Sequence, residues 1–243
     1  MTKEIANWYK EWFDTDFYHI LYRERNQKEA ELFMKNLTTY LNLPEQANIL
    51  DLGCGRGRHS VMLHQMGYKV KGFDLSENNI RFAKQFETEN LTFEIQDMCK
   101  TYPGRYDAIF NLFTSFGYFE DDQKHLSTLC MIKEHLNETG FGVIDFMNVT
   151  QIKDHLVPEE KVLVNDILFH IKRYEEDGYI LKDISFDHEG ASYHFTEKVR
   201  ALTLKDFEDM FEKAGIYLLD IFGDYKLNKY HPEQSDRLVM IFK

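Results

Sequence analysis

The sequence predicts a doubly wound α/β fold, in which helices cover both faces of a mostly parallel sheet. Short apolar runs alternate with amphipathic helical stretches between residues 47 and 146, and this alternation is typical of parallel sheets. Apolar and polar residues then alternate one by one over much of residues 150–201, as expected for antiparallel strands. We therefore expect one α/β domain that carries an antiparallel β insertion.

The first 43 residues are expected to form two or three helices ahead of the sheet. Trp8 and Trp12 recur at helical spacing, and a second apolar stripe lies between Leu32 and Leu41. Pro44 ends this helical segment because proline lacks the N–H group that a continuing helix needs.

Five strands and three helices are expected in the first part of the α/β domain. The strands are residues 47–52, 69–73, 91–95, 106–110 and 140–146. The helices are residues 58–66, 76–86 and 122–136. Gly67 ends the first helix and Ser76 caps the second. The fifth strand is apolar nearly throughout, as buried parallel strands are.

The insertion and the C-terminal part complete the expected elements. The inserted strands are residues 162–164, 167–174, 179–186 and 193–201, with turn sequences at residues 176–178 and 188–190. Thr203 then caps a helix that runs to about Ala214, with Gly215 just past its end. Two final strands are expected at residues 216–222 and 237–242.

Composition and charge exclude several classes of partner. The net charge is −12, and no dense cluster of Lys and Arg occurs, so we expect neither a nucleic-acid partner nor an anionic membrane surface. The three cysteines lack metal-ligand spacing, which predicts reduced thiols and no metal site. No apolar run is long enough to span a membrane and no signal peptide is evident, so a soluble, cytoplasmic protein is expected.

A glycine-rich turn directly follows the first expected strand. Residues 49–57 read ILDLGCGRG, so a buried strand runs into three alternating glycines and then into a helix. Glycine allows a tight turn and a close approach to a ligand, and the helix N-terminus supplies unpaired N–H groups. A dinucleotide site would need its third glycine at position 58, which is Arg58. S-adenosyl-L-methionine (SAM) has an α-ammonium group and no pyrophosphate, and the Asp51 carboxylate, two residues before the first glycine, can bind such a group. The spacing therefore favours SAM over a nicotinamide dinucleotide.

Two further carboxylates follow the next expected strands. Asp74 can accept hydrogen bonds from both hydroxyl groups of a ribose, although an acid at a helix N-terminus is also favoured by the helix dipole. Asp97 and Met98 follow the third strand, where they could contact the amino group and the ring face of an adenine. These positions extend the predicted cofactor site across three neighbouring strands.

These motifs and the order of the elements resemble the class I SAM-dependent methyltransferases over residues 45–150, and residues 203–243 are similar to the closing part of that family. The resemblance implies a Rossmann-like seven-stranded sheet of order 3-2-1-4-5-7-6. It implies cofactor contacts around the methionine part, the ribose and the adenine of SAM. The predicted cofactor-binding residues are Asp51, Gly53, Cys54, Gly55, Gly57, Asp74, Leu75, Asp97, Met98, Asn111, Tyr22, Arg25, Arg58 and His59.

The loop after the fourth strand, residues 111–118, lacks the Asp/Asn-Pro-Pro-Phe/Tyr tetrapeptide of enzymes that methylate nucleobase amino groups. It resembles instead the loop of amino-sugar N-methyltransferases and glycine N-methyltransferase-like enzymes, which also carry an N-terminal lid and a β-rich insertion. Tyr118 stands where the sugar enzymes can carry histidine. Tyr118 and Tyr22 are the candidate catalytic residues. The implied parts are a lid at 1–43, a methyltransferase domain at 44–149 and 202–243, and an insertion at 150–201.

We therefore expect methyl transfer from SAM to a nitrogen or oxygen nucleophile of a small molecule, by in-line displacement with S-adenosyl-L-homocysteine (SAH) as product. Two alternatives stay open: a SAM-binding protein without transferase activity, and a SAM-dependent C-methyl or cyclopropane-type transferase. The insertion could cover the substrate or form a dimer contact, so a monomer and a homodimer are both compatible with the sequence. Asp224 and Tyr225, in the loop before the last strand, could face the same cleft.

Overall fold

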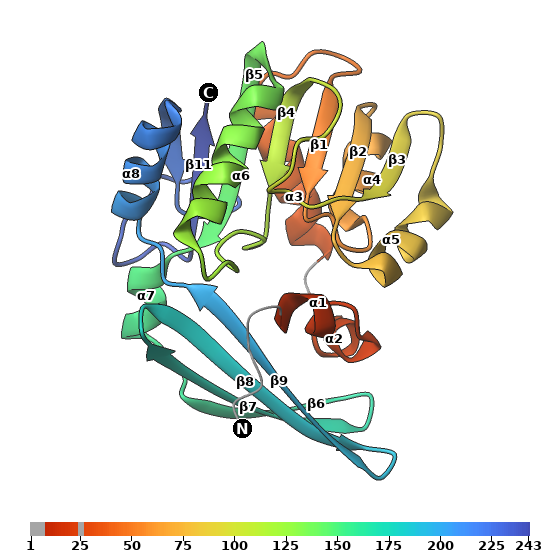
Figure 1. Ribbon diagram of the computed structural model, residues 1–243, viewed down its shortest axis with the longest axis vertical. Coiled ribbons are helices and arrows are strands. Elements are labelled where there is room, and N and C mark those ends of the chain that lie inside the picture. Colours follow the sequence, from red (N-terminus) through yellow and green to blue (C-terminus); the bar gives the residue numbers. More distant parts are fainter. Residues whose placement is uncertain (1–7, 24–26) are drawn as a thin grey trace.

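The computed structural model describes residues 8–23 and 27–243. Figure 1 shows an α/β domain, a separate four-stranded sheet below it, and two short helices between them. These helices are α1 (Trp8–Trp12) and α2 (Asp16–Leu21). The part of the chain that the structure describes contains no helix of the length and apolar character needed to cross a membrane.

A seven-stranded sheet forms the centre of the α/β domain. Its order is β10-β11-β5-β4-β1-β2-β3, which confirms the predicted order 3-2-1-4-5-7-6. Strands β1 to β5 are parallel, whereas β11 is antiparallel to both β5 and β10. The strands are β1 (Asn48–Leu52), β2 (Lys69–Asp74), β3 (Leu91–Ile95), β4 (Tyr106–Asn111), β5 (Leu136–Met147), β10 (Leu218–Phe222) and β11 (Arg237–Phe242).

Helices cover both faces of this sheet, and each face has its own apolar core. Met34, Leu63 and Ile80 are buried on one face, whereas Ile132 and Phe207 are buried on the other. Burying each such side chain stabilises the fold by roughly 1.5–3 kcal/mol before the entropy of ordering is counted. The first face carries α3 (Gln27–Tyr40), α4 (Arg58–Gln65), α5 (Glu77–Ala83) and the 3-10 turn η1 (Lys84–Phe86); the second carries α6 (Asp122–His135) and α8 (Leu204–Ala214).

The insertion is an antiparallel meander of order β6-β7-β8-β9, as the sequence predicts. Two-residue turns join its strands, and both residues of each turn have positive φ, as in Asp177 (51°) and Gly178 (76°). That geometry matches the right-handed twist of the flanking strands. The strands are β6 (Glu159–Val164), β7 (Ile167–Glu176), β8 (Tyr179–His188) and β9 (Ala191–Arg200).

Several boundaries differ from those expected from the sequence, and one helix is additional; the largest shift is in β5. Strand β5 begins at Leu136 instead of residue 140, because Leu136 already pairs with Tyr106 before the register shifts. The short helix α7 (Val149–Asp154) was not predicted, since its six residues are too few to show a helical apolar stripe. Helix α7 connects β5 to the insertion.

The inserted sheet and the N-terminal helices share one apolar core. Trp8 and Trp12 from α1 pack with Phe169, Ile184 and Phe186 of β7 and β8, and all five side chains are buried. The apolar face of the insertion is thus covered by helices of the same chain. Figure 1 shows α1 and α2 in this position, facing the carboxyl ends of the central strands on their other side.

Candidate active site

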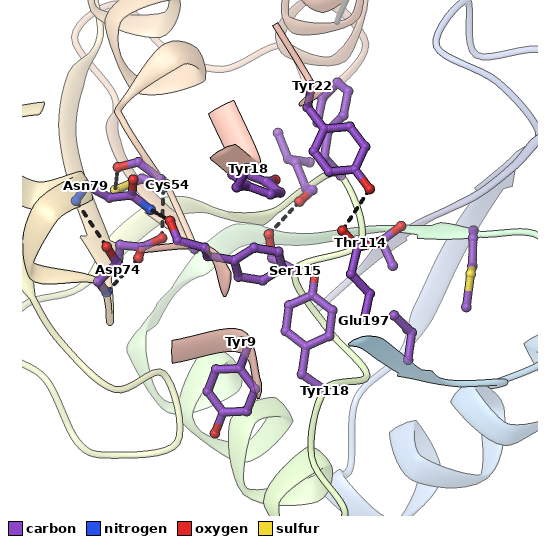
Figure 2. A pocket seen from close by; sticks show the side chains of 18 of the residues that line it. Tyr9, Tyr18, Tyr22, Cys54, Asp74, Asn79, Thr114, Ser115, Tyr118 and Glu197 are labelled. Atoms are coloured by element: carbon purple, nitrogen blue, oxygen red, sulfur yellow. Dashed lines mark hydrogen bonds between the residues drawn. The ribbon is translucent and has the colours of Figure 1, made fainter. Parts of the chain in front are cut away.

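A cavity of about 1110 Å³ lies where the central sheet, the N-terminal helices and the inserted sheet meet. Its walls include Asp74 and Met98 from the central sheet, Tyr22 after α2, and Lys182 and Glu197 from the insertion. Figure 2 shows Cys54, Asp74 and Asn79 grouped at one end, with Tyr22, Thr114, Tyr118 and Glu197 grouped at the other.

The three glycines after β1 serve different purposes. Gly53, Gly55 and Gly57 all have positive φ, at 77°, 56° and 82°. A Cβ atom at Gly53 would lie 2.8 Å from the Ser115 Cβ, and one at Gly57 would lie 2.7 Å from the Phe93 ring. A Cβ atom at Gly55 would meet nothing within 4 Å, and Gly55 lines the cavity. The middle glycine therefore leaves room that a ligand can fill.

Asp74 holds this turn against β2. Its Oδ2 accepts a hydrogen bond from the Gly55 N–H at 2.8 Å, and its Oδ1 accepts one from the Ser76 N–H at 2.8 Å. Burial raises the pKa of Asp74, and these two hydrogen bonds oppose that rise. The Asn79 side chain and the Leu75 backbone also oppose the rise, so hydroxyl groups of a ligand would share the lone pairs of Asp74 with these donors.

Asp51 lies at the end of β1, on the wall of the same cavity. It is 1% exposed and accepts a hydrogen bond of 2.6 Å from the Ser60 hydroxyl. Burial raises its pKa to about 6, and the nearby charge of Asp74 adds to that rise. A cation in the cavity would stabilise the charged form of this buried carboxylate.

The remaining predicted cofactor residues divide into three groups. Most of them line the cavity. Asn111 does not: it is fully buried and donates to the Leu52 carbonyl at 3.0 Å, while its Oδ1 has no partner among the described residues. Gly57 does not line the cavity either, and Arg25 lies outside the described residues. The predicted residues that line the cavity are Asp51, Gly53, Cys54, Gly55, Asp74, Leu75, Asp97, Met98, Tyr22, Arg58 and His59.

Arg58 and His59 lie at the start of α4 and pack on one ring. The His59 ring stacks on Phe113 with 4.5 Å between centroids, and the Arg58 guanidinium lies 4.9 Å from the Phe113 ring centre. Phe113 itself has a φ of 56°. Its backbone N–H donates to the Asp145 carboxylate at 2.8 Å, which holds this loop in its left-handed conformation.

A buried ion pair supports the same loop. Arg237 donates to Asp145 at 2.7 Å and to the Thr114 hydroxyl at 3.0 Å, and it also lines the cavity. Sequence reasoning missed Asp145 and Arg237 because they are 92 residues apart and meet only through the pairing of β5 with β11.

Asp224 and Tyr225 do not face the cavity, contrary to the expectation from the sequence. The Tyr225 ring is packed between Phe33 and Phe113, and its hydroxyl donates to Asp145 at 3.2 Å. Asp224 instead accepts hydrogen bonds within its own loop. The loop before β11 therefore packs behind Phe113, a residue of the cavity wall, and does not line the cavity itself.

The two candidate catalytic tyrosines lie at the end of the cavity away from Asp74 (Figure 2). Tyr118 packs on Trp8, with 5.1 Å between ring centroids. The Tyr22 hydroxyl donates to Glu197 at 2.7 Å and accepts a hydrogen bond from Lys182. Sequence reasoning missed Glu197 and Lys182, because their alternating strands carry no spacing that marks a site.

The N-terminal helices are also tied to the end of the cavity that contains Asp74. Asp14 accepts hydrogen bonds from the Ser76 hydroxyl and from the backbone and side-chain N–H groups of Asn78. His19 contacts the Asn79 side chain at 2.9 Å. Residues 8–23 thus bridge α5 and the inserted sheet and close the cavity between them. From here on, the lid means these residues alone, because α3 of the predicted lid at 1–43 packs on the central sheet.

Comparison with known proteins agrees with this geometry. A family model described as "Methyltransferase domain" matches residues 43–215, which is most of the chain. The chain belongs to the class I SAM-dependent methyltransferases. YqeM of Bacillus subtilis (strain 168), a protein named as a methyltransferase, is 26% identical over 209 residues that cover 81% of this chain and 84% of YqeM.

Solved structures show the same fold for this methyltransferase. A SAM-dependent methyltransferase from Clostridium acetobutylicum ATCC 824 superposes with a TM-score of 0.79 at 20% identity, covering 94% of this chain and 96% of the other. SAM-bound CalS10, an amino pentose methyltransferase from Micromonospora echinaspora, superposes with a TM-score of 0.73 at 16% identity, covering 93% and 95%.

Proposed function

We propose that this methyltransferase moves a methyl group from SAM to a nitrogen or oxygen nucleophile of a small molecule by in-line displacement. One observation carries the proposal: the glycine turn with Asp74 and the tyrosine cluster with Glu197 are opposite ends of one cavity. A methyl donor held at the first end would face an acceptor held at the second. Bound SAM supplies a sulfonium methyl group with a good leaving group.

The residues at the cofactor end fit the parts of SAM. The open side of Gly55 and the carboxylate of Asp51 suit the methionine part with its ammonium group. Asp74 suits the ribose hydroxyls, and Leu75, Asp97 and Met98 line the wall beyond it, where an adenine would lie.

The residues at the acceptor end suit alignment and exclusion of water. The rings of the lid and Tyr118 close the cavity from one side. Because Tyr22 gives its single hydroxyl proton to Glu197, its oxygen can meet a nucleophile only by accepting a hydrogen bond. Holding donor and acceptor in line is the main requirement for methyl transfer.

The insertion acts as a cap over the acceptor in this proposal, instead of as a dimer contact. Its apolar face is already covered by the lid, and Lys182 and Glu197 point from it to the cavity wall. CalS10, whose fold this chain shares, acts on an amino pentose, which supports a small acceptor bearing nitrogen.

Calorimetry with SAM and with SAH tests the cofactor end. Asp74→Asn should weaken both ligands at least about tenfold, because an amide cannot accept from both backbone N–H groups and also from a ribose. Asp16→Asn, at an exposed lid acid, is the matched control and should change neither affinity beyond about twofold. Unchanged affinity in Asp74→Asn, or no binding of either ligand to the wild-type protein, would refute the proposed function.

A further inference from the structure

We propose that Glu197 is the specificity-determining residue of the acceptor end, and that it selects a cationic amine over a neutral alcohol. This inference rests on the proposed function, because it concerns the acceptor of the same reaction. It starts from the environment of one carboxylate on the inserted strand β9.

One oxygen of Glu197 is occupied by the lid, and the other is not. The indole N–H of Trp12 and the hydroxyl of Tyr22 both donate to Oε1, each at 2.7 Å. No hydrogen bond within the described residues reaches Oε2, and the residue lines the cavity while only partly exposed. The Glu197 carboxylate is therefore oriented by two neutral groups and keeps acceptor capacity toward the cavity.

The charge of Glu197 also lacks a direct counterion within the described part of the chain. Lys182 is its cross-strand neighbour, but the Lys182 ammonium donates to the Tyr22 oxygen and lies 4.5 Å from the Tyr22 ring centre. The Tyr22 hydroxyl thus stands between the two charges. A cationic ligand would therefore stabilise this partly buried carboxylate, which has no direct counterion among the described residues.

Aromatic rings extend from this carboxylate along the cavity wall. Tyr22 contacts Tyr18 at 4.9 Å between centroids, Tyr18 contacts Phe13 at 4.8 Å, and Phe13 contacts Tyr118 at 5.4 Å. Ring faces attract ammonium groups and do not attract neutral hydroxyl groups in the same way.

The carboxylate and the rings together discriminate between acceptors. A hydrogen bond between an ammonium and a carboxylate is roughly twice as strong as one between neutral groups, and the cation–π attraction adds to it. The bound ammonium must first give one proton to the Glu197 carboxylate, so that its nitrogen has the electron pair that attacks the methyl group. The methylated amine formed in this way is charged again and keeps both attractions. An alcohol of the same shape has neither, so it binds less tightly at this end.

The test uses the two tryptophans of the chain, Trp8 and Trp12, which both lie in the lid beside this corner. The protein saturated with SAH is titrated with cyclohexylammonium and, separately, with cyclohexanol, and tryptophan fluorescence is followed. Glu197→Gln is the informative variant, because the amide oxygen can still accept from Trp12 and Tyr22 while the charge is lost. Glu176→Gln, an exposed glutamate on the same sheet, is the matched control.

A saturable response to cyclohexylammonium is expected at millimolar concentration, with a dissociation constant at least about tenfold lower than for cyclohexanol. Glu197→Gln should remove this preference and Glu176→Gln should retain it, with SAH affinity within about twofold in both. Equal responses to the two probes, no response up to about 50 mM, or a preference that survives Glu197→Gln would overturn the inference. SAH binding in the wild-type protein, measured alongside, would leave the proposed function standing in each of these cases.

Discussion

The two ends of the cavity are built in different ways. The proposed cofactor end consists of turns that follow β1, β2 and β3 directly, so its groups come from residues 51–98 and include backbone N–H groups. The acceptor end combines the lid with strands β8 and β9, and Trp12 meets Glu197 across 185 residues of sequence. Local backbone geometry defines the first end, whereas side chains brought together by the fold define the second.

This difference shows what each end can tolerate. A turn that depends on positive φ and on close approach accepts few substitutions, since any Cβ atom meets strain or a neighbour. A wall made of side chains can change its specificity while the backbone stays as it is. A common reaction is expected to depend on the end built from backbone turns, and differences in acceptor on the end built from side chains.

The largest expected effect is on stability, and it distinguishes two glycines of the turn: Gly57, which packs against Phe93, and Gly55, which faces the cavity. Gly57→Ala should lower the free energy of unfolding by about 2–5 kcal/mol, because the new methyl group adds a clash with Phe93 to the strain of positive φ. Gly55→Ala should cost only about 1–2 kcal/mol, since its methyl group meets nothing.

For the affinity toward SAH, the order of the two variants should be reversed, with the larger loss in Gly55→Ala. Gly55→Ala should weaken SAH at least about tenfold, because its methyl group enters space that the cofactor needs. Urea unfolding and calorimetry measure the two quantities. Equal losses of stability in the two variants would show that the turn is not divided in this way.

A smaller effect is expected from the titration of Asp51. Its pKa of about 6 in the folded protein exceeds the ordinary value of 3.8, so its contribution to stability is complete below 3.8 and is lost as pH rises through 6. The same ionisation should strengthen SAH binding up to about tenfold between pH 5 and pH 7, because the ligand ammonium gains a charged partner.

Calorimetry with SAH at pH 5, 6 and 7 measures this dependence. Asp51→Asn should make the affinity nearly independent of pH in this range. A pH dependence that persists unchanged in Asp51→Asn would assign it to another group and would remove Asp51 from the ammonium site.

The smallest effect is expected in the lid, where two nearby acids can be compared. Asp14 accepts three hydrogen bonds from Ser76 and Asn78 at the start of α5, whereas Asp16 forms one exposed ion pair with Arg56. Asp14→Ala should speed SAH release about five- to tenfold, since the lid loses its contact with the cofactor end. Asp16→Ala should change the rate less than about twofold. Stopped-flow displacement of SAH measures both rates, and equal rates would mean that the lid does not hold the cofactor.

The strands and helices of the α/β domain could be predicted from glycine turns and apolar runs, because these report local backbone directly, whereas the order of the strands followed from the family resemblance. Asp51, Asp74 and Met98 could be expected around one cavity, because they lie at or directly after neighbouring strands. Asn111 shows the limit: its place after β4 suggested a ligand contact, but its amide bonds the neighbouring strand. Glu197 could not be found, because strand alternation gives the face of a side chain and not the partner that will meet it.

The shared core of the lid and the insertion has a consequence for how the chain is made. The lid is synthesised before the strands that bury Trp8 and Trp12, which follow more than 150 residues later. At 5–20 residues per second, Trp12 waits about 10–40 s for the strand that carries Glu197. During translation the aromatic N-terminal segment is therefore an exposed apolar sequence, which makes it a natural binding site for chaperones until the inserted sheet emerges.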